Sequence, residues 1–193
     1  MTVAARAAID AANRDDPSEY DGEPLALAQG RLAEEWVTRL HPEASAALRL
    51  AARAHHLRRW TLPRESFPPG RPGYLRWRRE QKARHARDLE VILESAGVAP
   101  STVARAATIV TKRGLETDPE VQAFEDAVCL TFLVTQLVST ADKLADDAKM
   151  VDVVAKTLVK MSEAGRVAAL GIDLDERGSM LVSQAIAQLE CEG

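Results

Sequence analysis

The feature that most constrains the fold of this chain is the recurrence of apolar residues every three or four positions along nearly its whole length. Such spacing places the apolar side chains on one face of a helix. A clear example is the series Leu25, Ala28, Leu32, Trp36 and Leu40. No stretch shows the alternation of apolar and polar residues that is typical of a half-buried strand. The sequence therefore predicts an all-α fold.

Glycine, proline and capping residues divide this pattern into about seven or eight helices. We expect them over residues 2–13, 24–40, 43–59, 74–96, 100–113, 121–138, 146–163 and 175–189. Residues 62–73 hold four prolines and two glycines and are predicted to form a stiff, non-helical loop. The run 121–138 is apolar nearly all round, which is typical of a buried helix. At 193 residues, the chain is expected to form a single-domain helical bundle over residues 1–193.

Positive charge is concentrated in the middle of the chain. The whole sequence has a formal net charge of −4, yet residues 53–87 contain eleven Lys and Arg against two acids. Such a segment predicts a local positive field that attracts anions. The alternative is a solvated basic helix whose charges are paired with acidic neighbours. Because the sequence pI is about 5.6, general nucleic-acid binding is possible but not favoured.

Cysteine usage and hydropathy exclude several classes of protein. Cys129 and Cys191 are too few for a disulfide framework. No apolar run approaches the roughly 20 residues that a membrane-spanning helix needs, and the N-terminus lacks the pattern of a secretion signal. We therefore expect a cytoplasmic protein without membrane insertion. No feature of the sequence sets an oligomeric state.

Five titratable residues stand out for their positions on the predicted helices. Helical spacing turns His55 and His85 inward and places His56 nearer the rim. Glu125 and Asp126 lie on the helix that is predicted to be buried. A buried carboxylate without a partner costs several kcal/mol, so these two are expected to be hydrogen-bonded, salt-bridged or metal-bound. Ordinary pairing within the core is the alternative for each residue.

Imidazole and carboxylate groups are the ligands that divalent Mn, Fe, Ni or Zn accept. The preferred ligands are His56, His85 and Asp126, with His55 as a substitute, and Glu125 is the candidate catalytic base. A bound divalent metal lowers the pKa of its water toward 7, which would supply hydroxide to attack a phosphoester. The sequence therefore suggests a metal site, provided that the helices bring these residues together.

Basic and aromatic residues around the predicted loop are candidates for binding an anionic small molecule. They are Arg58, Arg59, Trp60, Arg64, Tyr74, Trp77, Arg78 and Lys82. Guanidinium groups can hold phosphate or carboxylate oxygens bidentately, and the aromatic rings can wall a pocket, although core packing is their simpler role. The leading hypothesis is a metal-dependent hydrolase of an anionic substrate. Two alternatives are a non-catalytic anion- or RNA-binding accessory protein and a non-haem iron oxygenase.

Three motifs resemble one known family. They are AARAHHLRRW at residues 51–60, GYLRWR at 73–78 and DPEVQAFED at 118–126. Together they resemble the domain of unknown function 4202 family, some of whose members have been labelled glutamyl-tRNA synthetase-like. The order of a His doublet, a later His and an Asp is also similar to the HD-domain phosphohydrolases. That second resemblance implies a helical bundle with a divalent metal. The sequence departs from the HD pattern at two places: His55-His56 stands where the pattern has His-Asp, and the first ligand histidine of the pattern falls near Ala28, which cannot bind a metal.

Overall fold

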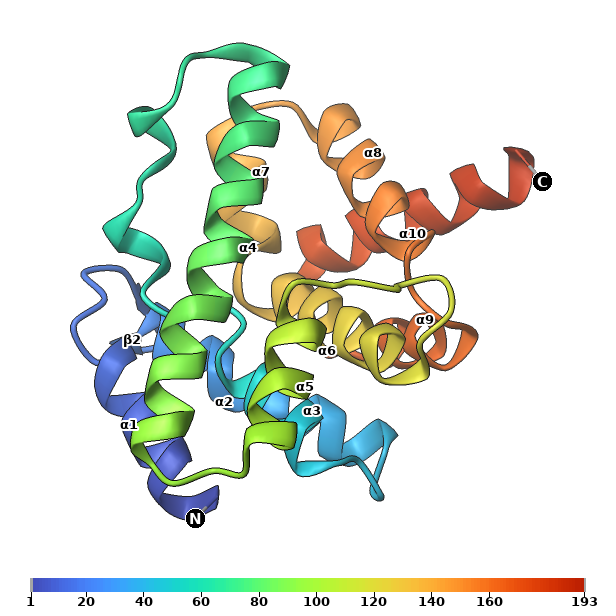
Figure 1. The fold of residues 1–193 in the computed structure, drawn as a ribbon. Helices are drawn as coiled ribbons and strands as arrows, with labels where there is room; N and C mark the ends of the chain where they lie inside the picture. The colour runs from blue at the N-terminus through green and yellow to red at the C-terminus, as the bar shows by residue number, and fades with distance from the viewer. Residues whose placement is uncertain (1, 193) are drawn as a thin grey trace. The chain divides into compact units, whose positions relative to one another are not determined.

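The chain is described by a computed structural model of residues 2–192, which are mostly helical (Figure 1). The helices are α1 (Thr2–Asn13), α2 (Leu25–Leu40), α3 (Ala46–Arg53), α4 (Gly70–Ser95), α5 (Pro100–Val110), α6 (Pro119–Thr135), α7 (Leu137–Leu144), α8 (Asp147–Leu158), α9 (Glu163–Leu170) and α10 (Glu176–Glu192). Two short 3-10 turns, η1 (Arg59–Thr61) and η2 (Arg64–Ser66), lie between α3 and α4. The strands β1 (Glu19–Tyr20) and β2 (Glu23–Pro24) form a small antiparallel hairpin. The predicted all-α fold is confirmed.

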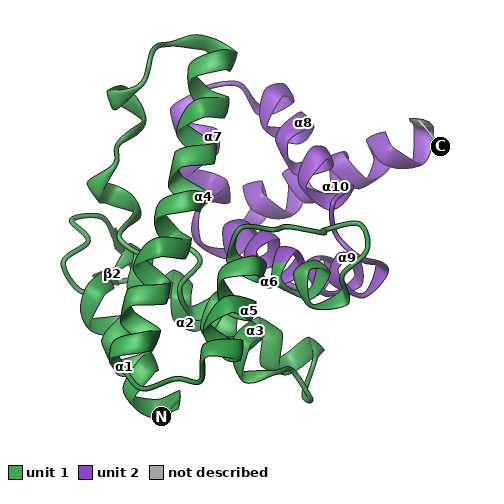
Figure 2. Cartoon of the chain, in the orientation of Figure 1, with its two compact units in different colours: residues 1–124 green, residues 125–193 purple. Residues whose placement is uncertain are grey.

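The chain divides into two compact units, with the boundary inside α6 (Figure 2). Unit 1 is Met1–Phe124 and unit 2 is Glu125–Gly193. Each unit has its own apolar core, with Leu48, Leu89 and Ile109 fully buried in unit 1 and Leu130, Met150 and Leu181 in unit 2. The expectation of one continuous domain over residues 1–193 stays a prediction.

In unit 1, helices α2 and α3 approach most closely at Gly30. A Cβ atom built on Gly30 would lie 2.3 Å from the carbonyl oxygen of Arg53, so this crossing has room only for glycine. Arg53 also joins the helices through its side chain. Its guanidinium donates two hydrogen bonds of 2.7 Å to Asp10 of α1 and one of 3.0 Å to Glu34 of α2. Backbone contact and ion pairs therefore fix α1, α2 and α3 together.

Several helix ends follow signals that are visible in the sequence. Gly97 follows α4 with a φ of +70°, a left-handed conformation that glycine adopts without strain. Asp118 precedes α6, and its Oδ1 accepts a hydrogen bond of 3.0 Å from the backbone nitrogen of Glu120. Ser162 plays the same role for α9, because its Oγ accepts from the backbone nitrogen of Gly165 at 3.1 Å.

The third predicted helix, over residues 43–59, is too long at both ends. It begins at Ala46, after the N-cap residue Ser45, and ends at Arg53. The chain then turns through residues 54–58, and Arg58 has a φ of +49° that no helix residue adopts. His55 and His56 therefore lie in a turn after α3 and not on the helix.

The predicted proline loop is shorter than expected, because α4 begins at Gly70 and not at Tyr74. Pro72 lies in the first turn of α4. The nitrogens of that turn have no partner within the helix, so a proline is tolerated there. The prediction of a non-helical loop was therefore wrong for residues 70–73 and for the short 3-10 turn η2, and it was correct for the other residues of 62–69.

Two longer predicted helices are each broken in the structure. The run 121–138 becomes α6 and α7, which meet at an angle of 65° with Gln136 between them. The run 146–163 becomes α8 and α9, since Ser162 starts a new helix. Within residues 2–192 no single helix has the length and apolar composition to cross a membrane, although α6 and α7 reach that limit as a bent pair.

Candidate anion-binding site

The segment that joins α3 to α4 runs alongside α4 (Figure 1) and is fastened to it by four side chains, of which Arg84 donates to the Thr61 hydroxyl at 2.5 Å. Trp77 Nε1, Gln81 Nε2 and His85 Nδ1 donate hydrogen bonds of 2.8 to 2.9 Å to carbonyl oxygens within residues 57–62. The three donors are spaced by four residues and therefore lie on one face of α4. Each turn of the helix thus holds the segment at one point, which gives the site a rigid frame.

Three histidines gather on this frame and are called here the histidine cluster: His55, His56 and His85. The ring centroids of His55 and His56 lie 4.2 Å apart, and those of His56 and His85 lie 6.4 Å apart. Each ring turns Nδ1 toward an oxygen that can only accept a hydrogen bond. These acceptors are the Ala52 carbonyl (3.1 Å), Gln29 Oε1 (2.5 Å) and the Leu57 carbonyl (2.8 Å). Nδ1 therefore carries the proton in a neutral ring, and Nε2 keeps a lone pair.

All three rings are neutral at pH 7. Burial lowers the pKa of His55 to about 3 and that of His85 to about 4, and it lowers the pKa of His56 well below its usual value. The positive charge of Arg59 lowers all three pKa values further. At neutral pH the cluster therefore offers nitrogen acceptors and not cations. Nε2 of His85 is buried, and no described atom forms a hydrogen bond with it.

Two arginines beside the cluster, called here the arginine pair, are Arg59 and Arg78. The Arg59 guanidinium lies 4.7 Å from the ring centre of Trp77, and that of Arg78 lies 5.7 Å from the ring centre of Tyr74. Burial lowers the pKa of Arg59 and the charge of Arg78 lowers it further, against an opposing effect of Tyr74. Among the described residues no carboxylate pairs with either guanidinium. Two repelling cations held on aromatic rings are therefore left with unused donors.

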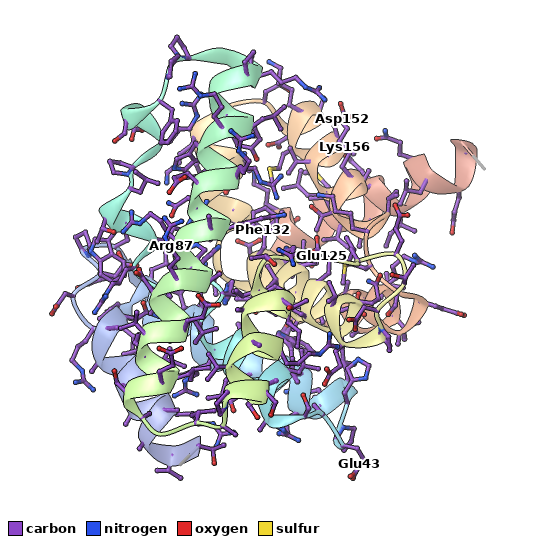
Figure 3. All side chains as sticks on the ribbon, in the orientation of Figure 1. Glu43, Arg87, Glu125, Phe132, Asp152 and Lys156 are labelled. Atoms are coloured by element: carbon purple, nitrogen blue, oxygen red, sulfur yellow. The ribbon has the colours of Figure 1, made fainter. Side chains whose placement is uncertain are left out.

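The basic middle section is neutralised only in part. Arg53 is paired with Asp10 and Glu34, and Arg87, which is labelled in Figure 3, is paired with Glu80 at 2.8 Å. Within residues 2–192, the arginines of this section that pair with no carboxylate are Arg58, Arg59, Arg64, Arg71, Arg76, Arg78, Arg79 and Arg84. Most positive charges of this section therefore stay without an acidic partner in folded unit 1. The alternative, in which acidic neighbours pair with the basic residues, holds among the described arginines only for Arg53 and Arg87.

The predicted aromatic residues have different surroundings. Trp77 is 9% exposed and supports Arg59 on its face, so it serves both as core and as platform. Tyr74 is 41% exposed, and its ring centre lies 5.9 Å from that of Trp77. Trp60 is partly exposed in the turn η1. Tyr74 and Trp77 thus form one platform, whereas Trp60 makes no ring contact with either of them within residues 2–192.

The remaining predicted substrate-binding residues lie at the margin of the site. Arg64 donates to the carbonyl oxygens of Phe67 and Pro68, both at 2.9 Å, and so braces the proline loop. Arg58 is exposed, and Lys82 is partly exposed on α4. The Arg64 donors that hold the loop are the ones that anion binding would need. A role of Arg64 in binding the anion stays a prediction.

The two acidic residues of the predicted site belong to unit 2. Both are buried on α6, at 4% exposure for Glu125 and 1% for Asp126. Cys129 Sγ donates to Glu125 Oε1 at 3.8 Å. The Asp126 carboxylate accepts from the backbone nitrogen of Ser162 at 2.8 Å and from its hydroxyl at 2.5 Å. Asp126 thus has a clear structural role, and the proposed roles of these residues as metal ligand and base stay predictions.

Replacing Asp126 with alanine is expected to lower the free energy of unfolding by about 2 to 3 kcal/mol, because two hydrogen bonds to a buried carboxylate are lost at the start of α9. Asp126→Asn should cost less, since its amide oxygen can still accept one of the two. Circular dichroism during urea unfolding measures both. Equal stability of Asp126→Ala and the parent would show that this contact contributes nothing to unit 2.

A bound metal needs several ligands around one point. Within residues 2–192, no three His, Cys, Asp or Glu side chains form a group that could hold a metal ion as they stand. The donor chemistry of the histidine cluster nevertheless suits a metal, because its rings are neutral and Nε2 of His85 is an orphaned buried acceptor. The chemical type of these side chains therefore fits a divalent metal. Their positions in residues 2–192 do not bring three ligands to one point.

Sequence reasoning missed several residues that build the site. Gln81 fastens the linking segment, Gln29 orients His56, and Lys112 contributes a positive charge that lowers the pKa of His55. Gln81 and Gln29 are almost fully buried. The only signal for Gln81 was its place between Trp77 and His85 at four-residue spacing on the inner face of α4.

A separate hollow of about 440 Å³ also lies in unit 1. It is lined by Leu40, His41, Pro42, Glu43, Ala44, Ser45, Leu48, Pro119, Glu120 and Ala123. No residue of the histidine cluster or the arginine pair borders it. One of its two carboxylates, Glu120, is already paired with Arg105 at 2.7 Å, so the charges that can bind an anion lie elsewhere.

Comparison with known proteins gives one match. A family model described as "Domain of unknown function (DUF4202)" matches residues 3–182. No curated protein and no solved structure matches the chain.

Proposed function

The chain belongs to the DUF4202 family, whose description assigns no activity, and we propose from its own geometry that unit 1 binds a phosphate- or carboxylate-bearing small molecule. The family resemblance of the three sequence motifs is thereby confirmed. The resemblance to HD-domain phosphohydrolases stays a prediction.

The arginine pair is the observation that carries this proposal. A partly buried guanidinium without a carboxylate partner is costly, and a second one beside it adds repulsion. An anion between Arg59 and Arg78 would remove both costs at once. Guanidinium groups are well suited to this role, because their planar forks match the oxygens of phosphate and carboxylate. The aromatic platform of Tyr74 and Trp77 keeps both forks in place.

Replacing Arg59 with glutamine is expected to weaken the binding of inorganic phosphate by about tenfold or more, because a charge-assisted hydrogen bond is worth about 1.5 to 3 kcal/mol. Arg78→Gln should have a similar effect. Isothermal titration calorimetry at low salt measures both. Arg87→Gln is the matched control, since Arg87 lies on α4 as Arg78 does and is already paired with Glu80. Unchanged affinity in the Arg59 and Arg78 variants would contradict the proposal.

Metal-dependent hydrolysis of the bound anion is the second proposed function, and Nε2 of His85 is the observation that favours it. His55, His56 and His85 would supply the nitrogen ligands of unit 1, and their rings would have to move closer together, because they form no metal-holding group as they stand in residues 2–192. A divalent metal bound there would activate water and polarise the substrate. The positive charges around the cluster oppose a cation, so we expect metal to bind more tightly when phosphate is present.

Elemental analysis of the purified protein, with and without phosphate, tests the metal proposal. We expect stoichiometric Mn, Fe, Ni or Zn in the parent and none in His85→Ala. A purified protein that contains no metal and still binds phosphate would contradict the hydrolase proposal. The same result would leave the anion-binding function standing.

A further inference from the structure

Gln81 has an acceptor that the fold does not use. Its side chain is 2% exposed on the inner face of α4. Both hydrogen bonds of its amide nitrogen go to carbonyl oxygens, those of Arg59 and Leu62, each at 2.9 Å. Because carbonyl oxygens only accept, the amide cannot be turned round, and Oε1 must point the other way. That oxygen is buried and has no hydrogen-bond partner among the described residues.

His85 repeats this arrangement one helical turn later. Its Nδ1 proton goes to the Leu57 carbonyl, and its buried Nε2 has no described partner. Residues four apart on a helix have Cβ atoms about 5–6 Å apart, so Oε1 of Gln81 and Nε2 of His85 belong to neighbouring side chains. Both groups are acceptors whose donors are already committed to the backbone of residues 57–62. A ligand that satisfies them must bring hydrogen-bond donors.

Arg78 and these two acceptors belong to one stretch of α4, and Arg59 of η1 packs against the same stretch. Trp77, which supports the Arg59 guanidinium, comes one turn before Gln81, and the Gln81 amide donates to the Arg59 backbone. Positive donors and neutral acceptors are therefore carried by neighbouring turns of α4 and by the segment fastened to them. A simple anion such as sulfate uses only the first kind of group, whereas a hydroxylated anion uses both.

We propose that the anion bound by the arginine pair is a small polyol phosphate, whose hydroxyl groups donate hydrogen bonds to Gln81 Oε1 and His85 Nε2. This inference rests on the proposed anion-binding function and adds the class of ligand. It assigns a binding role to Gln81, a residue that no sequence motif marked.

Glycerol 3-phosphate and propyl phosphate form a matched pair of probes, because they have the same carbon chain and phosphate and differ in two hydroxyl groups. We expect glycerol 3-phosphate to bind about tenfold more tightly or better, since propyl phosphate would bury the two acceptors without donors. Calorimetry with the full chain, treated with chelator to remove metal, measures both affinities.

The ratio of the two affinities separates recognition from structural damage. Gln81→Met keeps the length of the side chain and removes its oxygen, so the ratio should fall toward one even if both probes bind more weakly. Arg59→Gln should weaken both probes and leave the ratio as it is in the parent. Equal binding of the two probes by the parent would overturn this inference alone. Failure of both probes and of inorganic phosphate to bind would overturn the anion-binding function itself.

Discussion

Replacing Gly30 with alanine is expected to lower the free energy of unfolding of unit 1 by about 3 kcal/mol or more. The new methyl group would lie 2.3 Å from the Arg53 carbonyl oxygen, which belongs to the backbone of α3 and cannot rotate away. The helices must therefore move apart, and the hydrogen bonds from Arg53 to Asp10 and Glu34 would be strained. Without this contact the same change would stabilise a helix by about 1 kcal/mol, so even the sign of the result is informative.

Urea unfolding followed by tryptophan fluorescence is the suitable measurement, because Trp36, Trp60 and Trp77 all belong to unit 1. Gly171→Ala is the control, and because Gly171 belongs to unit 2, which contains no tryptophan, both variants are also followed by circular dichroism. Gly171 has an ordinary φ of −91°, and the nearest atom to its added Cβ is 3.6 Å away. That variant should stay within about 0.5 kcal/mol of the parent. A Gly30→Ala protein as stable as the parent would show that α2 and α3 do not cross as described.

Helix identity was largely predictable from the sequence, whereas helix ends were predictable only where a local signal sets them. Gly97 and Asp118 act through their own backbone and side chain. The helix end before Gly97 was predicted to within one residue, and α6 starts two residues before its predicted start. The end of α3 at Arg53 has no such signal, because residues 54–59 continue an acceptable helical pattern. The turn there depends on partners far along the chain, among them the Asn13 side chain, which accepts from the backbone nitrogen of Arg58 at 3.0 Å.

The types of residue in the candidate site were predictable from the sequence. Their hydrogen-bond and ion-pair partners were not. Inward spacing identified His85 correctly as buried, and the charge count located the positive segment. His55 is buried as predicted, although it lies in the turn after α3 and not on a helix. Which arginines are free depends on ion pairs such as Arg53 with Asp10, 43 positions apart in sequence. A sequence pattern contains no information on such distant pairs. The spare acceptor of Gln81 was equally invisible, since it follows from where the carbonyls of residues 57–62 lie.

Acidification should destabilise unit 1 through the histidine cluster. Burial lowers the folded-state pKa of His85 to about 4, while an unfolded chain has a pKa of about 6.5. Below pH 6.5 the unfolded state therefore takes up a proton that the folded state refuses. The stability due to the neutral ring is complete above pH 6.5 and is lost as the pH falls toward 4. Each unit of pKa difference corresponds to 1.36 kcal/mol, so His85 alone should remove about 3 kcal/mol by pH 4.

His85→Asn isolates this effect from the carboxylates that also titrate at low pH. Its amide can still donate to the Leu57 carbonyl, but it has no proton to gain. At pH 8 the variant should be less stable than the parent, and by pH 4.5 the difference should have shifted in its favour by about 2 to 3 kcal/mol. A difference that stays constant between these pH values would show that the ring is not held neutral. Phosphate should reduce the shift, because an anion on the arginine pair would offset the charge of Arg59 that helps to keep His85 unprotonated.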